Sequence, residues 1–325
     1  MNPCPSCLKE VRQKDHFCPK CSKELFGGDR KIKPLLDFDK QEYVSFQREA
    51  SGSFSISGVQ DKISLSIQEE RLTPTKTGGL YILKPVPTLE VPQFQNDIPA
   101  NEHLTMQLAG QVFKITTASN CLVRFNNDEP AYLTKRFDVA DGVKIAQEDF
   151  CQLLNMTEET HGQNYKYDSS YEQAASVIKT YCSAVQIESE KYFYLSLFCY
   201  LFSNGDAHLK NFSLQQTPYN DYILAPAYDL ISTAVHFPDE ARTALDLFEN
   251  YESDSFKENG FYKKIDFLKL AEFLGVKRNR AVSFIDRFFT RYEKTLALVH
   301  RSFLSEEAKE RFLVLFDDRL NAIES

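Results

Sequence analysis

The sequence predicts an α+β protein with two lobes, preceded by a small cysteine-rich segment. Two Cys-Pro-x-Cys motifs lie within residues 1–28, short alternating apolar runs dominate residues 29–150, and helical spacing of apolar side chains dominates residues 151–325. A chain of 325 residues is long enough for about two domains and a small appendix. We therefore expect a zinc-ribbon-like module at 1–28, a β-rich lobe at 29–150 and a helical lobe at 151–325.

The composition is that of an ordinary globular protein. Hydrophobic residues make up 42% of the chain and charged residues 26%, which excludes disordered and low-complexity classes. The formal net charge of −8 argues against broad nucleic-acid binding, which requires a basic face. The most apolar run, residues 192–202, is too short to span a bilayer, and no export signal is visible at the N-terminus. We expect a cytoplasmic protein with no membrane association and no direct contact with nucleic acid.

Short apolar runs predict the β-rich lobe. The predicted strands are the runs at 63–67, 80–83, 121–125 and 131–137. The last two flank NNDEP at 126–130, which predicts a hairpin. Residues 101–110 have helical spacing and end at a glycine. This third of the chain is therefore expected to be a sheet with one or two helices.

Helical patterns follow after residue 150. Residues 192–202 are expected to form a buried helix because they are almost entirely apolar. Asp266 is predicted to N-cap a helix that closes at Gly275, and Ser305 to N-cap another helix.

Four cysteines near the N-terminus predict a metal centre. Cys4, Cys7, Cys18 and Cys21 form two matched turns separated by ten residues. Four thiolates suit a structural Zn²⁺ and leave no open position for catalysis. A redox dithiol or an unmetallated pair is the alternative. The metal would fold a segment too short to fold alone, and the spacing does not decide whether the module also binds a partner.

The remaining cysteines lie in apolar segments and are expected to be small buried side chains: Cys121, Cys151, Cys182 and Cys199.

The stretch SNGDAHLKNFSL at 203–214 indicates phosphoryl transfer. Asp206 and Asn211 are five positions apart on a loop that leaves the predicted buried helix. Kinase catalytic loops use this offset for the aspartate that accepts the proton of the attacking hydroxyl and the asparagine that holds Mg²⁺ on ATP. A polar turn in which both residues serve as caps is the alternative.

Three further features fit the same chemistry. Asp229, after a predicted hairpin at 212–224, is a candidate for the carboxylate that bridges Mg²⁺ to phosphates, although Asp-Phe-Gly is absent. Lys84 ends a strand from which it would reach the phosphates, with Glu102 as its partner; a solvated strand end is the alternative. The hydroxyl-rich loop at 51–62 is a weak match to a phosphate-covering loop because its glycines do not form G-x-G-x-x-G.

The order of these motifs resembles the HipA-like serine/threonine kinases of bacterial toxin–antitoxin systems. The resemblance covers about residues 54–232 and extends less specifically to the C-terminus. It rests on SISGVQDKISL, YILKP, NEHLTMQLA, YLTKRFD, QEDFCQLL, NGDAHLKNFSL and APAYDLIS. It implies a two-lobed protein-kinase-like fold that binds ATP and Mg²⁺ between its lobes.

The resemblance also implies roles for individual residues. Asp206 is the expected catalytic base, and His208 and Lys210 belong to the same loop. Asn211 and Asp229 are expected to bind Mg²⁺. The residues expected to contact ATP are Lys84 and Glu102 on the phosphate side, Lys135, Arg136 and Phe137 beside adenine, and Ser57, Gly58 and Val59 in the phosphate loop.

A serine in the phosphate loop is the family's site of autophosphorylation. Ser55 matches that site, and Ser57 stands two residues on. A phosphate there would add about −1.5 to −2 charge where the ATP phosphates must bind. The alternative is that both hydroxyls only form hydrogen bonds within the loop.

The family also implies partners. Its members phosphorylate aminoacyl-tRNA synthetases, so a protein substrate of this kind is expected, together with an antitoxin that is itself DNA-binding in some systems. Longer members carry an extra N-terminal subdomain. This chain resembles the compact members, in which a separate small protein acts as antitoxin.

The sequence therefore predicts an ATP-dependent serine/threonine protein kinase. One alternative is a catalytically silent kinase-fold scaffold that docks an antitoxin or DNA-binding partner through the cysteine module. The presence of Lys84, Asp206, Asn211 and Asp229 argues against it. The second alternative is a small-molecule phosphotransferase, which the serine-bearing loop disfavours.

Overall fold

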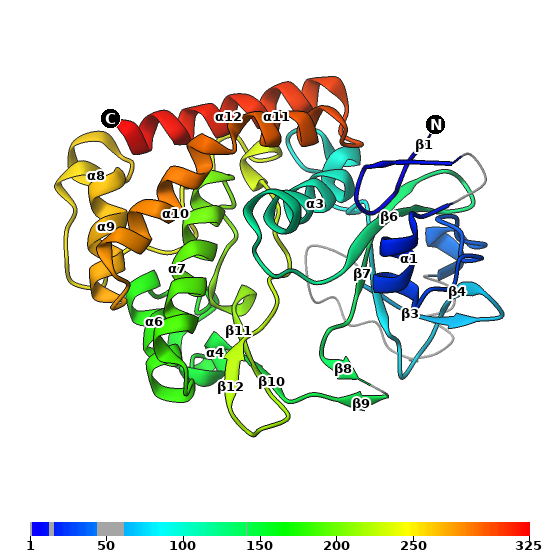
Figure 1. Cartoon of the computed structure of the whole chain (residues 1–325), viewed down its shortest axis with the longest axis horizontal. Helices are drawn as coiled ribbons and strands as arrows, with labels where there is room; N and C mark the ends of the chain where they lie inside the picture. Colours follow the sequence, from blue (N-terminus) through cyan, green and yellow to red (C-terminus); the bar gives the residue numbers. More distant parts are fainter. Residues whose placement is uncertain (1, 13–15, 44–61, 141) are drawn as a thin grey trace.

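A sheet-rich half and a helical half lie side by side in the computed structural model, which describes residues 2–12, 16–43, 62–140 and 142–325 (Figure 1). The strands are β1 (Asn2–Pro3), β2 (Glu10–Val11), β3 (Ile63–Gln68), β4 (Arg71–Pro74), β5 (Tyr81–Pro85), β6 (Asn120–Arg124), β7 (Pro130–Lys135), β8 (Val139–Ala140), β9 (Val143–Lys144), β10 (Gln147–Asp149), β11 (Ser213–Gln216) and β12 (Tyr222–Leu224). The α-helices are α1 (Pro19–Phe26), α3 (Ile98–Gln107), α4 (Phe150–Leu153), α5 (Glu158–His161), α6 (Tyr171–Tyr181), α7 (Val185–Leu201), α8 (Asp254–Asn259), α9 (Lys264–Phe273), α10 (Arg278–Thr290), α11 (Tyr292–His300) and α12 (Glu306–Glu324). Short 3-10 helices are η1 (Gln95–Asp97), η3 (Leu209–Asn211) and η4 (Thr233–Val235), and a π-helical segment, η2 (Leu108–Phe113), continues α3.

The main sheet of the described residues is antiparallel and has the strand order β4-β3-β5-β7-β6. Side chains alternate between the two faces of a strand. On β5, Leu83 packs in the apolar cluster shared with the N-terminal segment, whereas Lys84 lies beside Glu102 of α3. β5 pairs with β7 so that Lys84 lies opposite Tyr132. The central strand thus carries a charged group on the face that α3 covers.

The N-terminal segment packs directly on the other face of this sheet. Leu25 and Phe26 of α1 belong to one apolar cluster with Leu65 and Leu83 of the sheet. The hydroxyl of Tyr81 on β5 donates a hydrogen bond to the carbonyl of Leu25 at 2.8 Å. The cysteine-rich segment and the β-rich lobe therefore share a core, and the boundary at residue 28 stays a prediction.

The helical half is built around α7, whose apolar residues are buried on nearly every side. Phe202 follows the helix, and its ring lies 4.7 Å from Phe316 of α12 and 5.5 Å from Phe113, measured between centroids. Helix α12 runs along the outside of this half in Figure 1. The chain then turns at Ser203, with φ of 51°, into the loop that precedes η3.

Most of the expected elements are confirmed. The strands at 63–67, 80–83, 121–125 and 131–137 and their hairpin are present with shifts of one or two residues in their bounds, and the four scattered cysteines are buried. The buried helix expected at 192–202 begins earlier, at Val185, and the helix expected to stop at Gly110 continues through it to Phe113. Ser305 caps α12 by accepting a hydrogen bond from the Ala308 N–H. No helix within the described parts of the chain is both long and apolar enough to cross a membrane.

The predicted N-cap at Asp266 is wrong. Helix α9 begins at Lys264, so Asp266 lies in its first turn. Its carboxylate accepts a hydrogen bond from the Lys263 N–H at 2.7 Å and another from the Ser253 hydroxyl at 2.6 Å. The helix ends before Gly275, whose φ of 74° suits a glycine.

Substituting Phe202 with alanine is expected to lower the free energy of unfolding by about 3–5 kcal/mol, because the cavity would open in a packed aromatic cluster. Urea denaturation measures the effect. Val314 on α12 is 59% exposed, so Val314→Ala should change stability by less than about 0.5 kcal/mol. Equal effects for the two variants would contradict the assigned core.

Candidate active site and metal centre

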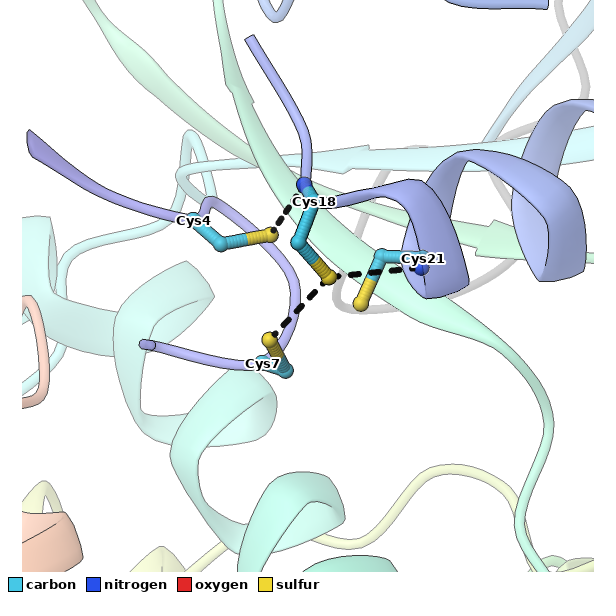
Figure 2. Close-up of side chains that lie close together, drawn as sticks. All are labelled: Cys4, Cys7, Cys18 and Cys21. Carbon is cyan, nitrogen blue, oxygen red and sulfur yellow. Dashed lines mark hydrogen bonds between the residues drawn. The ribbon is translucent and has the colours of Figure 1, made fainter. Parts of the chain in front are cut away.

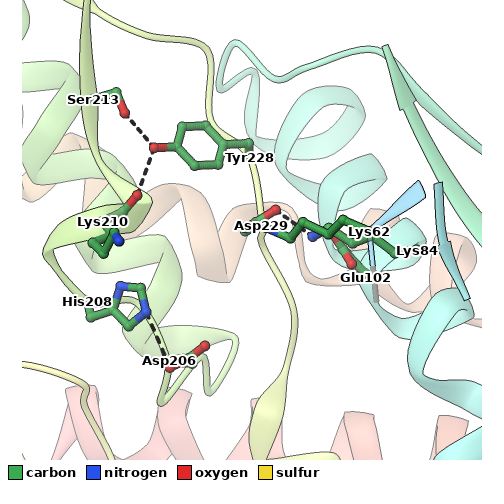
Figure 3. A network of polar contacts seen from close by, with 9 residues as sticks. All are labelled: Lys62, Lys84, Glu102, Asp206, His208, Lys210, Ser213, Tyr228 and Asp229. Carbon is green, nitrogen blue, oxygen red and sulfur yellow. Dashed lines mark hydrogen bonds and ion pairs between the residues drawn. The ribbon is translucent and has the colours of Figure 1, made fainter. Parts of the chain in front are cut away.

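Lys84 lies in a buried ion-pair network where the sheet meets the helical half (Figure 3). Its side chain is 5% exposed, and its Nζ lies 2.6 Å from Oε1 of Glu102 and 2.5 Å from Oδ1 of Asp229. Lys62, just before β3, approaches the other Asp229 oxygen at 3.6 Å. Strand β5, helix α3 and the segment after β12 therefore meet at one charged cluster.

The network keeps Lys84 and Asp229 charged at neutral pH. Burial alone would lower the pKa of Lys84, but the Asp229 and Glu102 carboxylates outweigh it and raise this pKa above its ordinary value. Burial opposes ionisation of Asp229 as well, yet Lys84 and Lys62 lower the pKa of Asp229 to about 2. For Glu102, burial dominates over the attraction of Lys84 and raises the pKa to about 7.

The backbone around Asp229 is tied to the loop after α7. Asp229 has φ of 54°, a left-handed conformation that is uncommon outside glycine. The hydroxyl of the preceding Tyr228 donates a hydrogen bond to the Lys210 carbonyl at 2.9 Å and lies 2.5 Å from the Ser213 hydroxyl oxygen. These contacts fix the segment that directs the Asp229 carboxylate toward Lys84.

Asp206 lies on the loop between α7 and η3 with aromatic and imidazole neighbours. Its Oδ1 accepts a hydrogen bond from the Tyr167 hydroxyl, and Nε2 of His208 lies 3.7 Å from the same oxygen. The His208 ring meets the Tyr167 ring edge-on at 5.1 Å between centroids. Burial lowers the pKa of His208 to about 4, so its imidazole is neutral at physiological pH. His208 therefore places no positive charge beside Asp206.

A second set of hydrogen bonds supports this loop from behind. The Gly205 N–H donates to the Thr233 hydroxyl oxygen at 2.7 Å, and the same hydroxyl donates to Glu240 at 2.5 Å. A Cβ at position 205 would lie 2.7 Å from the Glu240 carboxyl group and 3.0 Å from the Ala241 carbonyl oxygen, so a larger residue would displace the Glu240 side chain. Arg319 of α12 donates to the Ser203 hydroxyl at 3.0 Å.

Two oxygen donors of the helical half, Asn211 and Asp229, have the chemistry that a magnesium ion requires. Oδ1 of Asn211 is buried and makes no hydrogen bond within the described residues, although buried polar atoms are normally paired. Asp229 supplies an ionised carboxylate. Mg²⁺ prefers carboxylate and carbonyl oxygens and keeps several waters or phosphate oxygens as further ligands.

The four N-terminal cysteines converge on one point (Figure 2). Their sulfur atoms all lie within 4.8 Å of one another, and those of Cys7 and Cys18 are 3.7 Å apart. A tetrahedral zinc site with Zn–S bonds near 2.3 Å separates its sulfurs by about 3.8 Å. The pKa of Cys4 lies below its usual range because the thiols of Cys21 and Cys7 donate hydrogen bonds to its sulfur. The donor set fits Zn²⁺.

Among the described residues, the other predicted site residues make no hydrogen bond or ion pair with the Lys84 network. Lys135 ends β7, and Arg136 pairs with Asp138 at 2.6 Å. The Phe137 ring lies 5.7 Å from the Tyr228 ring. Lys210 is exposed and its Nζ lies 3.4 Å from the Tyr165 hydroxyl. The predicted loop residues Ser55, Ser57, Gly58 and Val59 lie outside the described residues.

Several neighbours of the site had no assigned role in the sequence analysis. They are Lys62, Tyr167, Tyr228, Thr233 and Glu240. Lys62 is the last residue of the predicted phosphate loop, and its positive charge could have identified it as a neighbour of the phosphate site. Tyr167 and Glu240 lie far from the loop in sequence, and only the tertiary fold brings them to it.

The sequence is similar to a protein family and to an individual relative. Residues 54–296 match the family model described as HipA-like C-terminal domain. A Haemophilus influenzae protein named "Putative kinase" is 27% identical over 98% of this chain and 97% of its own length.

Two solved structures resemble most of this chain. HipA of Shewanella oneidensis, solved with HipB and operator DNA, has a TM-score of 0.62 and 20% identity over 88% of this chain and 70% of its own. The Helicobacter pylori proinflammatory kinase CtkA has a TM-score of 0.54 and 16% identity over 80% of this chain and 93% of its own. These matches confirm the predicted two-lobed kinase-like fold. Since the family model spans most of the sequence, the chain belongs to the family defined by the HipA-like C-terminal domain.

Proposed function

We propose that this protein is an ATP- and Mg²⁺-dependent serine/threonine protein kinase. The observation that carries the proposal is the buried contact of Lys84 with Glu102 and Asp229, which joins the sheet to the helical half. Active kinases require an ion pair between a sheet lysine and a helix glutamate, together with an aspartate that holds Mg²⁺. The kinase-like fold and the family membership support the same activity.

The nucleotide would be held by residues from both halves. Lys84, positioned by Glu102, would contact its phosphates, and Asn211 with Asp229 would hold Mg²⁺. Mg²⁺ supplies neutralisation of the charge that develops on the phosphates. The segment Lys135, Arg136 and Phe137 would present backbone groups to adenine, and Ser57, Gly58 and Val59 would cover the phosphates.

The loop after α7 would carry the chemistry of the acceptor hydroxyl. Asp206 would accept its proton, while the Tyr167 hydroxyl holds the carboxylate in place. The neutral imidazole of His208 would lie beside this carboxylate, with its Nε2 3.7 Å from Oδ1. Lys210 would approach the transferring phosphoryl group from the exposed side of the loop.

The substrate and regulation are proposed from the family. Ser55 and Ser57 are the proposed autophosphorylation sites, where a phosphate would repel the ATP phosphates. A translation-related protein such as an aminoacyl-tRNA synthetase is the proposed target. HipA of Shewanella oneidensis was solved with HipB and operator DNA, which supports an antitoxin as a partner here.

Asp229→Asn is expected to remove the Mg²⁺-dependent part of ATP binding, a loss of about 2–5 kcal/mol, because it removes the negative charge that pairs with the buried Lys84. Calorimetric titration of ATP with and without Mg²⁺ measures it. The exposed neighbour Asp239 provides the control, since Asp239→Asn should bind as the unmodified chain does. Unchanged affinity in Asp229→Asn would overturn the metal assignment.

Asp206→Asn is expected to bind Mg-ATP normally but to transfer phosphate about 10²–10⁴-fold more slowly, because the general base is lost. Intact-mass analysis of dephosphorylated protein incubated with Mg-ATP follows self-phosphorylation, and peptide mapping tests Ser55 and Ser57. Asp128→Asn, on an exposed turn, is the control. No phosphate gain in the unmodified chain, even with Mg-ATP bound, would favour the silent scaffold instead.

A further inference from the structure

We propose that the Cys4, Cys7, Cys18 and Cys21 centre binds Zn²⁺ and that this zinc strengthens nucleotide binding by holding α3 and β5 in register. Glu102 lies on α3 and Lys84 on β5. The inference extends the proposed function, because it assigns a regulatory metal to the same nucleotide site. It rests on contacts that each half of the cysteine centre makes with a different one of these elements.

The first cysteine turn is bonded to α3 and its π-helical extension. Nε2 of His103 lies 2.7 Å from the Ser6 carbonyl oxygen, and Nε2 of Gln111 donates to the Cys7 carbonyl at 3.0 Å. His103 is fully buried and directly follows Glu102. The turn between the first two ligands therefore fixes the helix at the residue beside the Lys84 partner.

The same turn is also bonded to β6. The Leu122 N–H donates to the Pro5 carbonyl at 2.9 Å, and the Ser6 hydroxyl donates to the Asn120 carbonyl at 2.8 Å. Asn120 in turn accepts a hydrogen bond from Gln107 of α3 at 2.8 Å. The turn, the helix and the edge strand thus form one closed set of buried contacts.

The second cysteine pair is attached to β5 on the opposite face of the sheet. Cys18 caps α1, with its sulfur accepting the Cys21 N–H at 3.5 Å. At the end of this helix, the Leu25 carbonyl accepts the Tyr81 hydroxyl, and the Phe26 ring lies 5.8 Å from the Tyr81 ring. Tyr81 is the first residue of β5, the strand that carries Lys84.

A metal bound by all four sulfurs would therefore connect the two elements. Figure 2 shows Cys4 and Cys7 on one segment and Cys18 and Cys21 on the other. Strands β1 and β2 are each two residues long and lie at the two ends of the first turn. Four bonds to Zn²⁺ would be much stronger than thiol hydrogen bonds. Loss of zinc is expected to loosen α3 against β5 and to separate Glu102 from Lys84.

The first test compares Mg-ATP affinity of the full chain with and without zinc. Cys18→Ser removes one ligand but keeps a side chain that is a good helix N-cap. Its Mg-ATP dissociation constant should rise about tenfold, a typical size for coupled sites. Cys182→Ser, a buried cysteine outside the centre, should retain one zinc and the original affinity. Absence of bound zinc in the unmodified chain, or unchanged affinity after its loss, would overturn the proposal.

The second test uses the reciprocity of coupled equilibria. Saturating Mg-ATP should tighten zinc binding, measured by competition with a chromophoric chelator, by the same factor. Gln111→Ala should keep zinc and reduce that factor, because it removes a link between the turn and the helix. Lys20→Ala, on the exposed side of α1, should leave the factor unchanged. A factor of one in the unmodified chain refutes the coupling. If Cys18→Ser does not fold, the comparison of Gln111→Ala with Lys20→Ala decides whether zinc binding and Mg-ATP binding are coupled.

Hydrogen exchange separates this inference from the proposed function. If the zinc-loaded chain binds no Mg-ATP, the kinase proposal fails. The zinc link is then judged by exchange of the α3 amides at 98–107, which should lose protection when zinc is removed. Unchanged protection of these amides would overturn the zinc link. Mg-ATP binding with the same affinity with and without zinc would overturn the zinc inference but would not affect the kinase proposal.

Discussion

The buried ammonium group of Lys84 is the constraint around which the two halves are arranged. A charge in this position needs partners, since an unpaired buried charge costs about 3–5 kcal/mol. Those partners come from α3 and from the segment after β12, which are far apart in sequence. The sheet, α3 and the helical half meet at this point, and this allows the side chains of Lys84 and Glu102 to be buried.

The two halves contribute different chemistry to this meeting point. The sheet brings the cations Lys84 and Lys62, and the helical half brings the carboxylate of Asp229. Asp206 and Asn211 lie on the loop after α7 and on η3 of the same half. The loop that carries Asp206 is held by Thr233 and Glu240 behind Gly205, so its geometry depends on the helical core. The acidic side of the site is thus preorganised by α-helical packing and the basic side by the sheet.

Local pattern was sufficient for most of the fold. Alternation of apolar and polar residues predicted β3, and a continuous apolar run predicted the buried part of α7. Both patterns follow from which faces of the element are buried. The motif order identified Lys84, Glu102 and Asp229 as members of one site, and the structure brings those three together.

Sequence reasoning failed where tertiary contacts decide. Asp266 has the residue type of an N-cap, but Ser253 and the Lys263 N–H use its carboxylate inside the first turn. Tyr167 and Glu240 reach the Asp206 loop through folding of distant segments, which no spacing rule encodes. Their ordinary surroundings in the sequence gave no sign of this role.

The turn at Pro5 has a consequence for solubility. Strand β6 is the outer strand of the sheet, and an uncovered outer strand can recruit strands of other molecules. Pro5 and Pro34 accept its outward N–H groups at Leu122 and Arg124, and proline has no N–H with which to continue the ladder. The N-terminal residues therefore protect the sheet from edge-to-edge aggregation. Deleting them would expose the backbone N–H groups of the edge strand β6.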